Sequence, residues 1–108
     1  MRNKLNEGLL FTYYGGLLNE HQQEVLHSYY DCDMSLAEIS EYLHISRQAV
    51  RDTIVRSNAK LTEYENKLSL ISKIKDIATD FESILLHETF SESQKRELLS
   101  ILNRIKEI

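Results

Sequence analysis

Apolar residues recur along this chain every three or four positions, which is the period of an α-helix, and no run alternates apolar and polar residues over the length of a strand. The pattern therefore predicts an all-α fold of about five or six helices. The first helix is expected over residues 2–14, with Leu5 and Tyr13 on one face. Gly15 and Gly16 should end this helix, because successive glycines favour a left-handed C-cap.

A second helix is expected from Asn19, a suitable N-cap, to Tyr30. Further along, a long amphipathic stretch covers residues 58–87. Its apolar positions are Leu61, Tyr64, Leu68, Ile71, Ile74, Ile77 or Ala78, Phe81, and Ile84 or Leu85. Ser91 and Gln94 form a capping box that opens a last helix, which could fold back and cover part of this apolar stripe. A stripe of this length also suits a coiled-coil seam, so a homodimer is a reasonable expectation.

The segment 35–57 predicts two short helices around a tight turn. Ser35 can cap the first helix, and Glu38 is placed to complete a capping box. His44 stands at the turn, where glycine is common because it tolerates a positive φ. Ser40 stands where alanine is usual, so its hydroxyl should bond to a backbone carbonyl one turn back.

The second helix of this segment opens at Ser46 and is predicted to have two distinct faces. Its inward face should hold Ala49, Val50, Thr53 and Ser57. Its outward face should hold Arg47, Gln48, Arg51 and Val55. A helix that buries one side and presents arginine and glutamine on the other suits the major groove of DNA.

The candidate DNA-contacting residues are Ser46, Arg47, Gln48, Arg51, Asp52, Val55, Arg56 and Lys60. Arg47 and Arg51 could reach guanine or phosphate, and Gln48 could read adenine. Val55 could touch a thymine methyl group. Asp52 could accept a hydrogen bond from cytosine N4, but its charge would also repel phosphates.

Three of these positions are expected to hold the DNA backbone. The free N–H groups of a helix N-terminus at Ser46 can bind a phosphate, and Arg56 and Lys60 would contact phosphates rather than bases. The net charge of −4 opposes binding to a polyanion, although the basic residues of this helix are clustered. We therefore expect modest DNA affinity. In the competing interpretation, the same residues are ordinary solvated positions of a protein-interaction module.

The length of 108 residues suits a single all-α domain, with the N-terminal helices and the helix-turn-helix in 1–60 and an amphipathic helical extension in 61–108. No stretch approaches the ~18 apolar residues of a membrane span, and the N-terminus makes a poor signal peptide, so a cytoplasmic location is expected. Cys32 is the only cysteine, and no catalytic triad, glycine-rich phosphate loop or metal-ligand cluster is evident. We expect neither enzyme activity nor a cofactor or metal site.

Residues 20–61 resemble the DNA-binding fourth region of bacterial sigma factors, in which the recognition helix starts at a serine-arginine pair like Ser46-Arg47. The chain as a whole resembles the YlxM-like family of small bacterial helix-turn-helix proteins over most of residues 5–75. The matching pieces are Leu10-Phe11, Tyr13-Tyr14, Leu17-Leu18, Gln22-Gln23, Tyr29-Tyr30, Ser35 to Ile39, Ser46 to Val50 with Asp52, Tyr64-Glu65 and Lys67-Leu68.

Members of that family are typically encoded beside the genes for the protein components of the signal recognition particle. The resemblance therefore implies a role linked to that pathway. The leading hypothesis is a DNA-binding regulatory protein. The alternative is a protein- or RNA-binding accessory factor of the signal recognition particle that does not bind DNA sequence-specifically.

Overall fold

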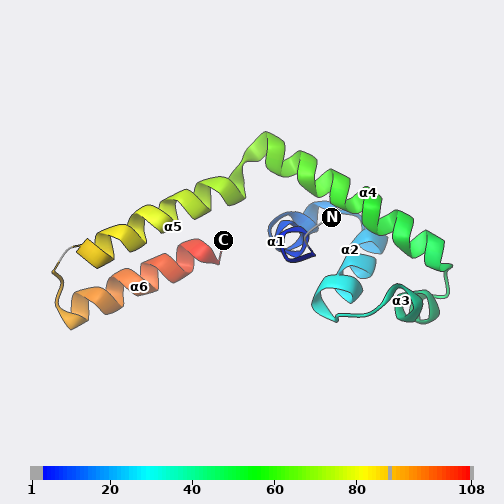
Figure 1. Cartoon of the computed structure of the whole chain (residues 1–108), viewed down its shortest axis with the longest axis horizontal. Helices are drawn as coiled ribbons and strands as arrows, with labels where there is room; N and C mark the ends of the chain where they lie inside the picture. The colour runs from blue at the N-terminus through cyan, green and yellow to red at the C-terminus, as the bar shows by residue number, and fades with distance from the viewer. Residues whose placement is uncertain (1–3, 88, 108) are drawn as a thin grey trace. The chain divides into compact units, whose positions relative to one another are not determined.

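A computed structural model describes residues 4–87 and 89–107, and within these ranges the chain forms six α-helices and no strand (Figure 1). The helices are α1 (Lys4–Tyr14), α2 (Glu20–Leu26), α3 (Leu36–Leu43), α4 (Arg47–Leu68), α5 (Leu70–His87) and α6 (Glu92–Lys106). The predicted all-α fold is confirmed. None of the described helices is long and apolar enough to cross a membrane.

The chain divides into two compact units, an N-terminal unit of Met1–Leu68 and a C-terminal unit of Ser69–Ile108. The N-terminal unit contains α1 to α4, and the C-terminal unit contains α5 and α6. The single domain expected from the sequence, with a subdivision after residue 60, stays a prediction. Residue 60 itself lies within α4.

The core of the N-terminal unit lies where α1, α2 and α3 pack against α4. Its buried apolar side chains are Tyr14, Leu18, Val25, Leu26, Ile39, Val50, Ile54 and Leu61. Burying each of the larger aliphatic side chains stabilises the fold by roughly 1.5–3 kcal/mol. Because three helices share one partner, the position of α4 is fixed by the whole core of this unit.

Helix α1 ends at Tyr14 as predicted, but not through a left-handed glycine cap. No glycine in the described part has a positive φ, and Gly15–Leu17 instead form a short 3₁₀ turn. Gly15 is required for space, since a Cβ atom there would lie 2.7 Å from the Phe11 ring. Residues 2 and 3 and the side chain of Leu5, which the sequence assigned to this helix, lie outside the described part.

Helix α2 begins as predicted, with Asn19 as its N-cap, and Gln22 completes a capping box. The α-helical part ends at Leu26, however, and the chain continues to Asp31 in a wider π-helical turn, His27–Asp31. From this turn, the ring of Tyr30 packs against that of Phe11 with their centroids 6.1 Å apart. The predicted continuous α-helix to Tyr30 is therefore wrong in its last turn.

The long stretch predicted over residues 58–87 is not one helix. Its first part belongs to the 22-residue α4, and the chain breaks at Ser69, which has a φ of 54°. The backbone carbonyl of Ser69 then accepts a hydrogen bond from the Lys73 N–H at 2.9 Å and starts α5. A left-handed residue ends a helix, but it is usually glycine or asparagine, so a serine gave no sequence signal.

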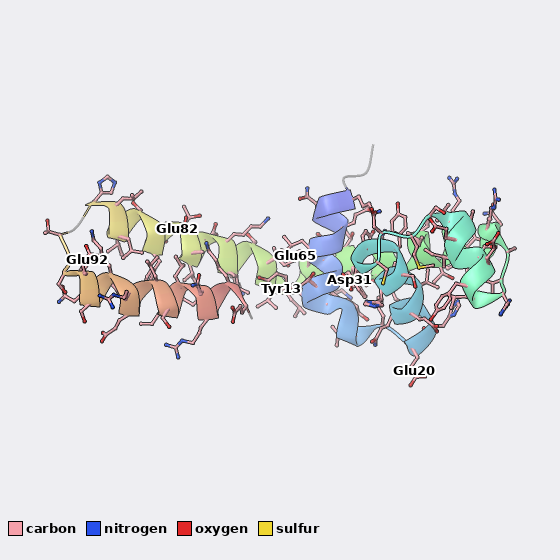
Figure 2. The ribbon with its side chains drawn as sticks, turned by 90° about the horizontal axis from the view of Figure 1, so that it is seen from below. Tyr13, Glu20, Asp31, Glu65, Glu82 and Glu92 are labelled. Carbon is pink, nitrogen blue, oxygen red and sulfur yellow. The ribbon has the colours of Figure 1, made fainter. Side chains whose placement is uncertain are left out.

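Within the C-terminal unit, α6 folds back beside α5, and the two helices run side by side in both views, where Glu82 marks α5 and Glu92 marks α6 (Figures 1 and 2). This confirms the predicted fold-back, and Ser91 and Gln94 form the predicted capping box. The buried apolar residues of the pair are Ile71, Ile74, Ala78 and Leu102. Of the alternatives left open by the sequence, Ala78 is buried and Leu85 half-buried, whereas Ile77 and Ile84 are exposed.

Candidate nucleic-acid interface

The helix-turn-helix has local features that the sequence largely predicted. Ser35 and Glu38 form the expected capping box at the start of α3, with both hydrogen bonds at 3.1 Å. His44 takes the left-handed conformation, with φ 57° and ψ 43°. The Ser40 hydroxyl bonds forward across the turn to the Ile45 carbonyl, at 2.5 Å, and not to a carbonyl one turn back. It thereby ties the end of α3 to the start of α4.

Helix α4 begins directly after Ser46, whose hydroxyl accepts a hydrogen bond from the Ala49 N–H at 3.0 Å. The inward residues are those predicted, since Val50 and Ser57 are buried and Ala49 and Thr53 are half-buried. The sequence prediction omitted two buried residues of the same helix, Ile54 and Asn58. The reason is that α4 is covered from both sides, by α1 as well as by α3.

All eight candidate contact residues are exposed, and the Val55 side chain keeps 42% of its surface accessible. One interaction within this set was not anticipated. The Gln48 Nε2 donates to the Asp52 Oδ1 at 2.8 Å, so the two side chains are bonded to each other across one helical turn. The Gln48 amide must break its hydrogen bond to Asp52 before it can form hydrogen bonds with the edge of an adenine base.

Lys67 near the end of α4 pairs with Glu63, but the four basic residues among the candidates are not neutralised by neighbouring acids. Within residues 4–87 and 89–107, no carboxylate forms an ion pair with Arg47, Arg51, Arg56 or Lys60. Asp52, the acidic residue among the candidates, bonds to an uncharged amide instead. The four cationic groups are therefore available to an anionic ligand such as a phosphate backbone.

A pocket of about 400 Å³ opens beside Arg51 in the N-terminal unit. It is lined by Lys4, Glu7, Tyr29, Leu36, Arg51, Ile54, Val55 and Asn58. The Lys4 ammonium lies 4.2 Å from the centre of the Tyr29 ring and 3.1 Å from an Asp33 carboxylate oxygen. Lys4 thus stands at the rim of the candidate interface, and sequence reasoning missed it because it belongs to a separate helix.

A partly buried polar cluster at this pocket joins α1, the π-helical turn and α4. The Tyr30 hydroxyl and the Asn58 amide both donate to the same Glu7 carboxylate oxygen, at 3.1 and 3.2 Å, and Asn58 also lies 2.8 Å from the Tyr30 hydroxyl. Burial, together with the Glu7 charge, raises the pKa of the Tyr30 phenol well above its ordinary value, against the lowering effect of the Asn58 hydrogen bond. A further hydrogen bond between α1 and α4 runs from the Tyr14 hydroxyl to the Glu65 carboxylate.

Other kinds of site find little support in the described residues. No group of three or more His, Cys, Asp or Glu side chains there could hold a metal ion. Cys32 is exposed and forms no disulfide. The features that stand out are the capped turn, the anchored inner face of α4 and its exposed cationic outer face.

These features define a small all-α helix-turn-helix protein. The chain belongs to the UPF0122 family, whose model is described as "Putative helix-turn-helix protein, YlxM / p13 like" and matches residues 1–102. The family resemblance drawn from the sequence is thereby confirmed.

Relatives in this family are similar to the chain over different lengths. A UPF0122 protein of Clostridium kluyveri is 38% identical over 107 residues, which cover 97% of this chain and 96% of the relative. A UPF0122 protein of Desulforamulus reducens is 51% identical over 71 residues, covering 66% of this chain and 59% of the relative. A UPF0122 protein of Thermoanaerobacter sp. (strain X514) is 38% identical over 99 residues, covering 90% and 85%.

Proposed function

We propose that the chain is a cytoplasmic, homodimeric DNA-binding regulatory protein that places the exposed face of α4 in the major groove. The observation that carries this proposal is the cationic face of α4, free of ion pairs in the described part, on a helix whose opposite side is anchored in the core. The capped turn before it fixes the start of α4 relative to the end of α3. A recognition helix needs this combination of a fixed inner face and an available outer face.

The helical period places the basic residues of α4 in two rows, one along each edge of its outer face, and a DNA groove is bordered by two phosphate backbones. Arg51 and Arg56 are five residues apart, so they lie on opposite edges of the outer face, roughly 140° apart around the helix. Arg47 lies on the same edge as Arg51, and Lys60 lies on the edge of Arg56. The cations can therefore contact the two phosphate backbones that border a groove.

Between these edges, Gln48, Asp52 and Val55 occupy the middle of the outer face, where base edges would be met. Gln48 would read adenine and Val55 a thymine methyl group. The Asp52 carboxylate would hold the Gln48 amide and repel nearby phosphates, and acceptance of a hydrogen bond from cytosine N4 is the alternative role for it. The N–H groups at the start of α4, after Ser46, would bind a phosphate.

The second candidate function is a protein- or RNA-binding accessory factor of the signal recognition particle. The observations that favour it are the acidic net charge and the Gln48–Asp52 bond, which places a carboxylate in the middle of the proposed reading face. A carboxylate there weakens binding to any duplex phosphate backbone. A protein partner with its own basic groups would be less affected.

The discriminating experiment is crosslinking of the tagged chain in cells that express it, followed by sequencing of the bound DNA and RNA and identification of bound proteins. A regulator enriches defined promoter fragments, and Arg47→Glu/Arg51→Glu abolishes that enrichment. The control is Lys95→Glu/Arg96→Glu, the same change of charge on exposed residues of α6. Recovery of the particle's RNA or proteins without DNA enrichment would overturn the regulator and support the accessory factor.

A further inference from the structure

The pocket of about 400 Å³ beside Arg51 places a cation of α1 next to a cationic edge of α4. Arg47 and Arg51 are four residues apart and therefore lie on one edge of that helix. Two residues that follow along the same edge, Val55 and Asn58, line the pocket, and Lys4 lines it from α1. The cationic edge therefore continues from α4 onto a second helix of the N-terminal unit.

Two side chains outside α1 and α4 hold the Lys4 ammonium in place. It lies 4.2 Å from the centre of the Tyr29 ring and donates to the Asp33 Oδ1 at 3.1 Å. The face of an aromatic ring and a carboxylate each attract a cation. A lysine ammonium has three N–H donors, and among the described residues Asp33 is the one whose oxygen accepts from Lys4. Lys4 is therefore positioned at the pocket with donor capacity left for a ligand.

The charged groups that line the pocket favour an anion. Lys4 and Arg51 contribute positive charges, and Glu7 contributes the opposing negative charge. One Glu7 oxygen already accepts hydrogen bonds from the Tyr30 hydroxyl and the Asn58 amide. Arg51 forms no ion pair with any carboxylate of residues 4–87 or 89–107. A small anionic group can therefore bind between the Arg51 guanidinium and the Lys4 ammonium.

We propose that this pocket is a phosphate subsite of the DNA interface, in which Lys4 and Arg51 together bind the backbone of one DNA strand. The inference rests on the proposed function, because it requires that the outer face of α4 enters the major groove. From Arg47 to Asn58 the helix axis extends roughly 16 Å, and one DNA strand carries a phosphate every ~3.4 Å along its axis. A strand that borders this edge can therefore offer one phosphate to Arg47 and another to the pocket.

In this subsite Asp33 competes with the phosphate for Lys4. The Asp33 side chain is 92% exposed and that of Lys4 is 45% exposed. An ion pair with this exposure is weak and changes an equilibrium constant by roughly fivefold at most. A DNA phosphate can displace Asp33, because its attraction to a cation is reinforced by the release of counterions. Asp33 therefore lowers the DNA affinity without preventing binding, and its effect depends on the presence of Lys4.

The test is binding of the full chain to a fluorescein-labelled DNA duplex of mixed sequence, measured by fluorescence anisotropy over a series of salt concentrations. A phosphate contact does not depend on base sequence, so no operator needs to be known. Lys4→Gln should lower the affinity roughly fivefold and reduce the slope of log affinity against log salt by about 1. Lys4→Arg should retain both the affinity and the slope. Lys95→Gln, the same loss of charge on α6, should change neither.

A second measurement tests the competition between Asp33 and the phosphate. Asp33→Asn should raise the affinity for the same duplex by up to roughly fivefold, because Lys4 then has no carboxylate to leave. The loss caused by Lys4→Gln should be larger in the Asp33→Asn background than in the wild-type chain. A long-range effect of charge alone would give equal losses in the two backgrounds. Asp31→Asn, which removes a neighbouring carboxylate that pairs with His27, should raise the affinity less.

Failure of this subsite and failure of the proposed function give different results. Unchanged affinity and salt slope for Lys4→Gln, with binding abolished by Arg47→Glu/Arg51→Glu, would overturn the subsite alone, as would equal losses in the two Asp33 backgrounds. A wild-type chain that binds no duplex would overturn both proposals. A loss that Lys4→Gln causes for a single-stranded RNA but not for the duplex would overturn the assignment to DNA. Because Lys4 and Asp33 are exposed, both variants should keep the wild-type circular dichroism spectrum, and if Lys4→Gln misfolded, the Asp33→Asn affinity would decide.

Discussion

Gln48 and Asp52 lie one turn apart on the exposed side of α4, and the Gln48 amide donates to the Asp52 carboxylate at 2.8 Å. Both residues lie between the two cationic edges of the helix. The bond orders the Gln48 side chain in the absence of a ligand, and it brings a negative charge into the proposed reading face. The same pair therefore orients one group of the proposed DNA-reading face while it weakens the attraction of that face to phosphates.

Asp52→Asn should strengthen binding to the DNA recovered from cells. Removing one carboxylate near phosphates is worth about 1 kcal/mol in a water-like environment, or roughly fivefold in affinity. Fluorescence anisotropy at fixed salt measures this change. Asp76→Asn, in the C-terminal unit, is the matched control and should leave DNA affinity unchanged. Weaker binding by Asp52→Asn would mean that the carboxylate accepts a bond from a base.

His44→Gly should stabilise the protein. His44 holds a φ of 57°, and relief of a left-handed backbone strain is worth on the order of 1 kcal/mol, less the extra entropy that glycine gains on unfolding. Urea unfolding followed by circular dichroism measures the change. Glu41→Gly, in the interior of α3, should instead lower the free energy of unfolding by about 1 kcal/mol. Equal effects of the two variants would contradict the role assigned to the turn.

Ser57→Ala should also stabilise the N-terminal unit. The Ser57 hydroxyl is fully buried and has no hydrogen-bond partner in the described part of the chain. Removing an unsatisfied buried hydroxyl of this kind gains on the order of 1 kcal/mol, provided that the small cavity is tolerated. Thermal unfolding measures the shift. A lower melting temperature would indicate that the hydroxyl is bonded in solution.

Tyr30 should make the stability of the fold fall at high pH. Burial raises the pKa of its phenol, so the folded state keeps the proton where the unfolded chain, with a pKa of about 10, loses it. The free energy of unfolding is therefore unaffected by this group below about pH 10 and decreases as the pH rises above that value. Urea unfolding across that range measures the slope. Tyr30→Phe should remove this part of the decrease, and an unchanged slope would contradict it.

The features predicted correctly from the sequence depend on neighbours within one helical turn. Ser35 with Glu38 and Ser91 with Gln94 cap their helices through side chains three residues apart, so the local spacing determines the contact. The positive φ of His44 follows similarly from its place in a recognised motif.

The features that sequence reasoning missed depend on distant contacts or on unusual backbone choices. Lys4 reaches the pocket beside Arg51 from another helix, whereas the need for Gly15 depends on how the ring of Phe11 is turned one helical turn earlier. The break at Ser69 lacks the glycine or proline that normally marks a helix end. The Gln48–Asp52 bond, although local, is one of several geometries that the same spacing allows.

Helix α4 runs without interruption from Arg47 to Leu68, so its exposed and core-facing residues share one register. A single inserted residue within it would rotate everything downstream by about 100° and move core positions such as Leu61 toward the surface. In the loop of residues 32–35, which joins the π-helical turn to α3, a change of length would leave the helical register of α4 unchanged. Length variation within this fold should therefore be excluded from α4 and concentrated in the segments that join the helices.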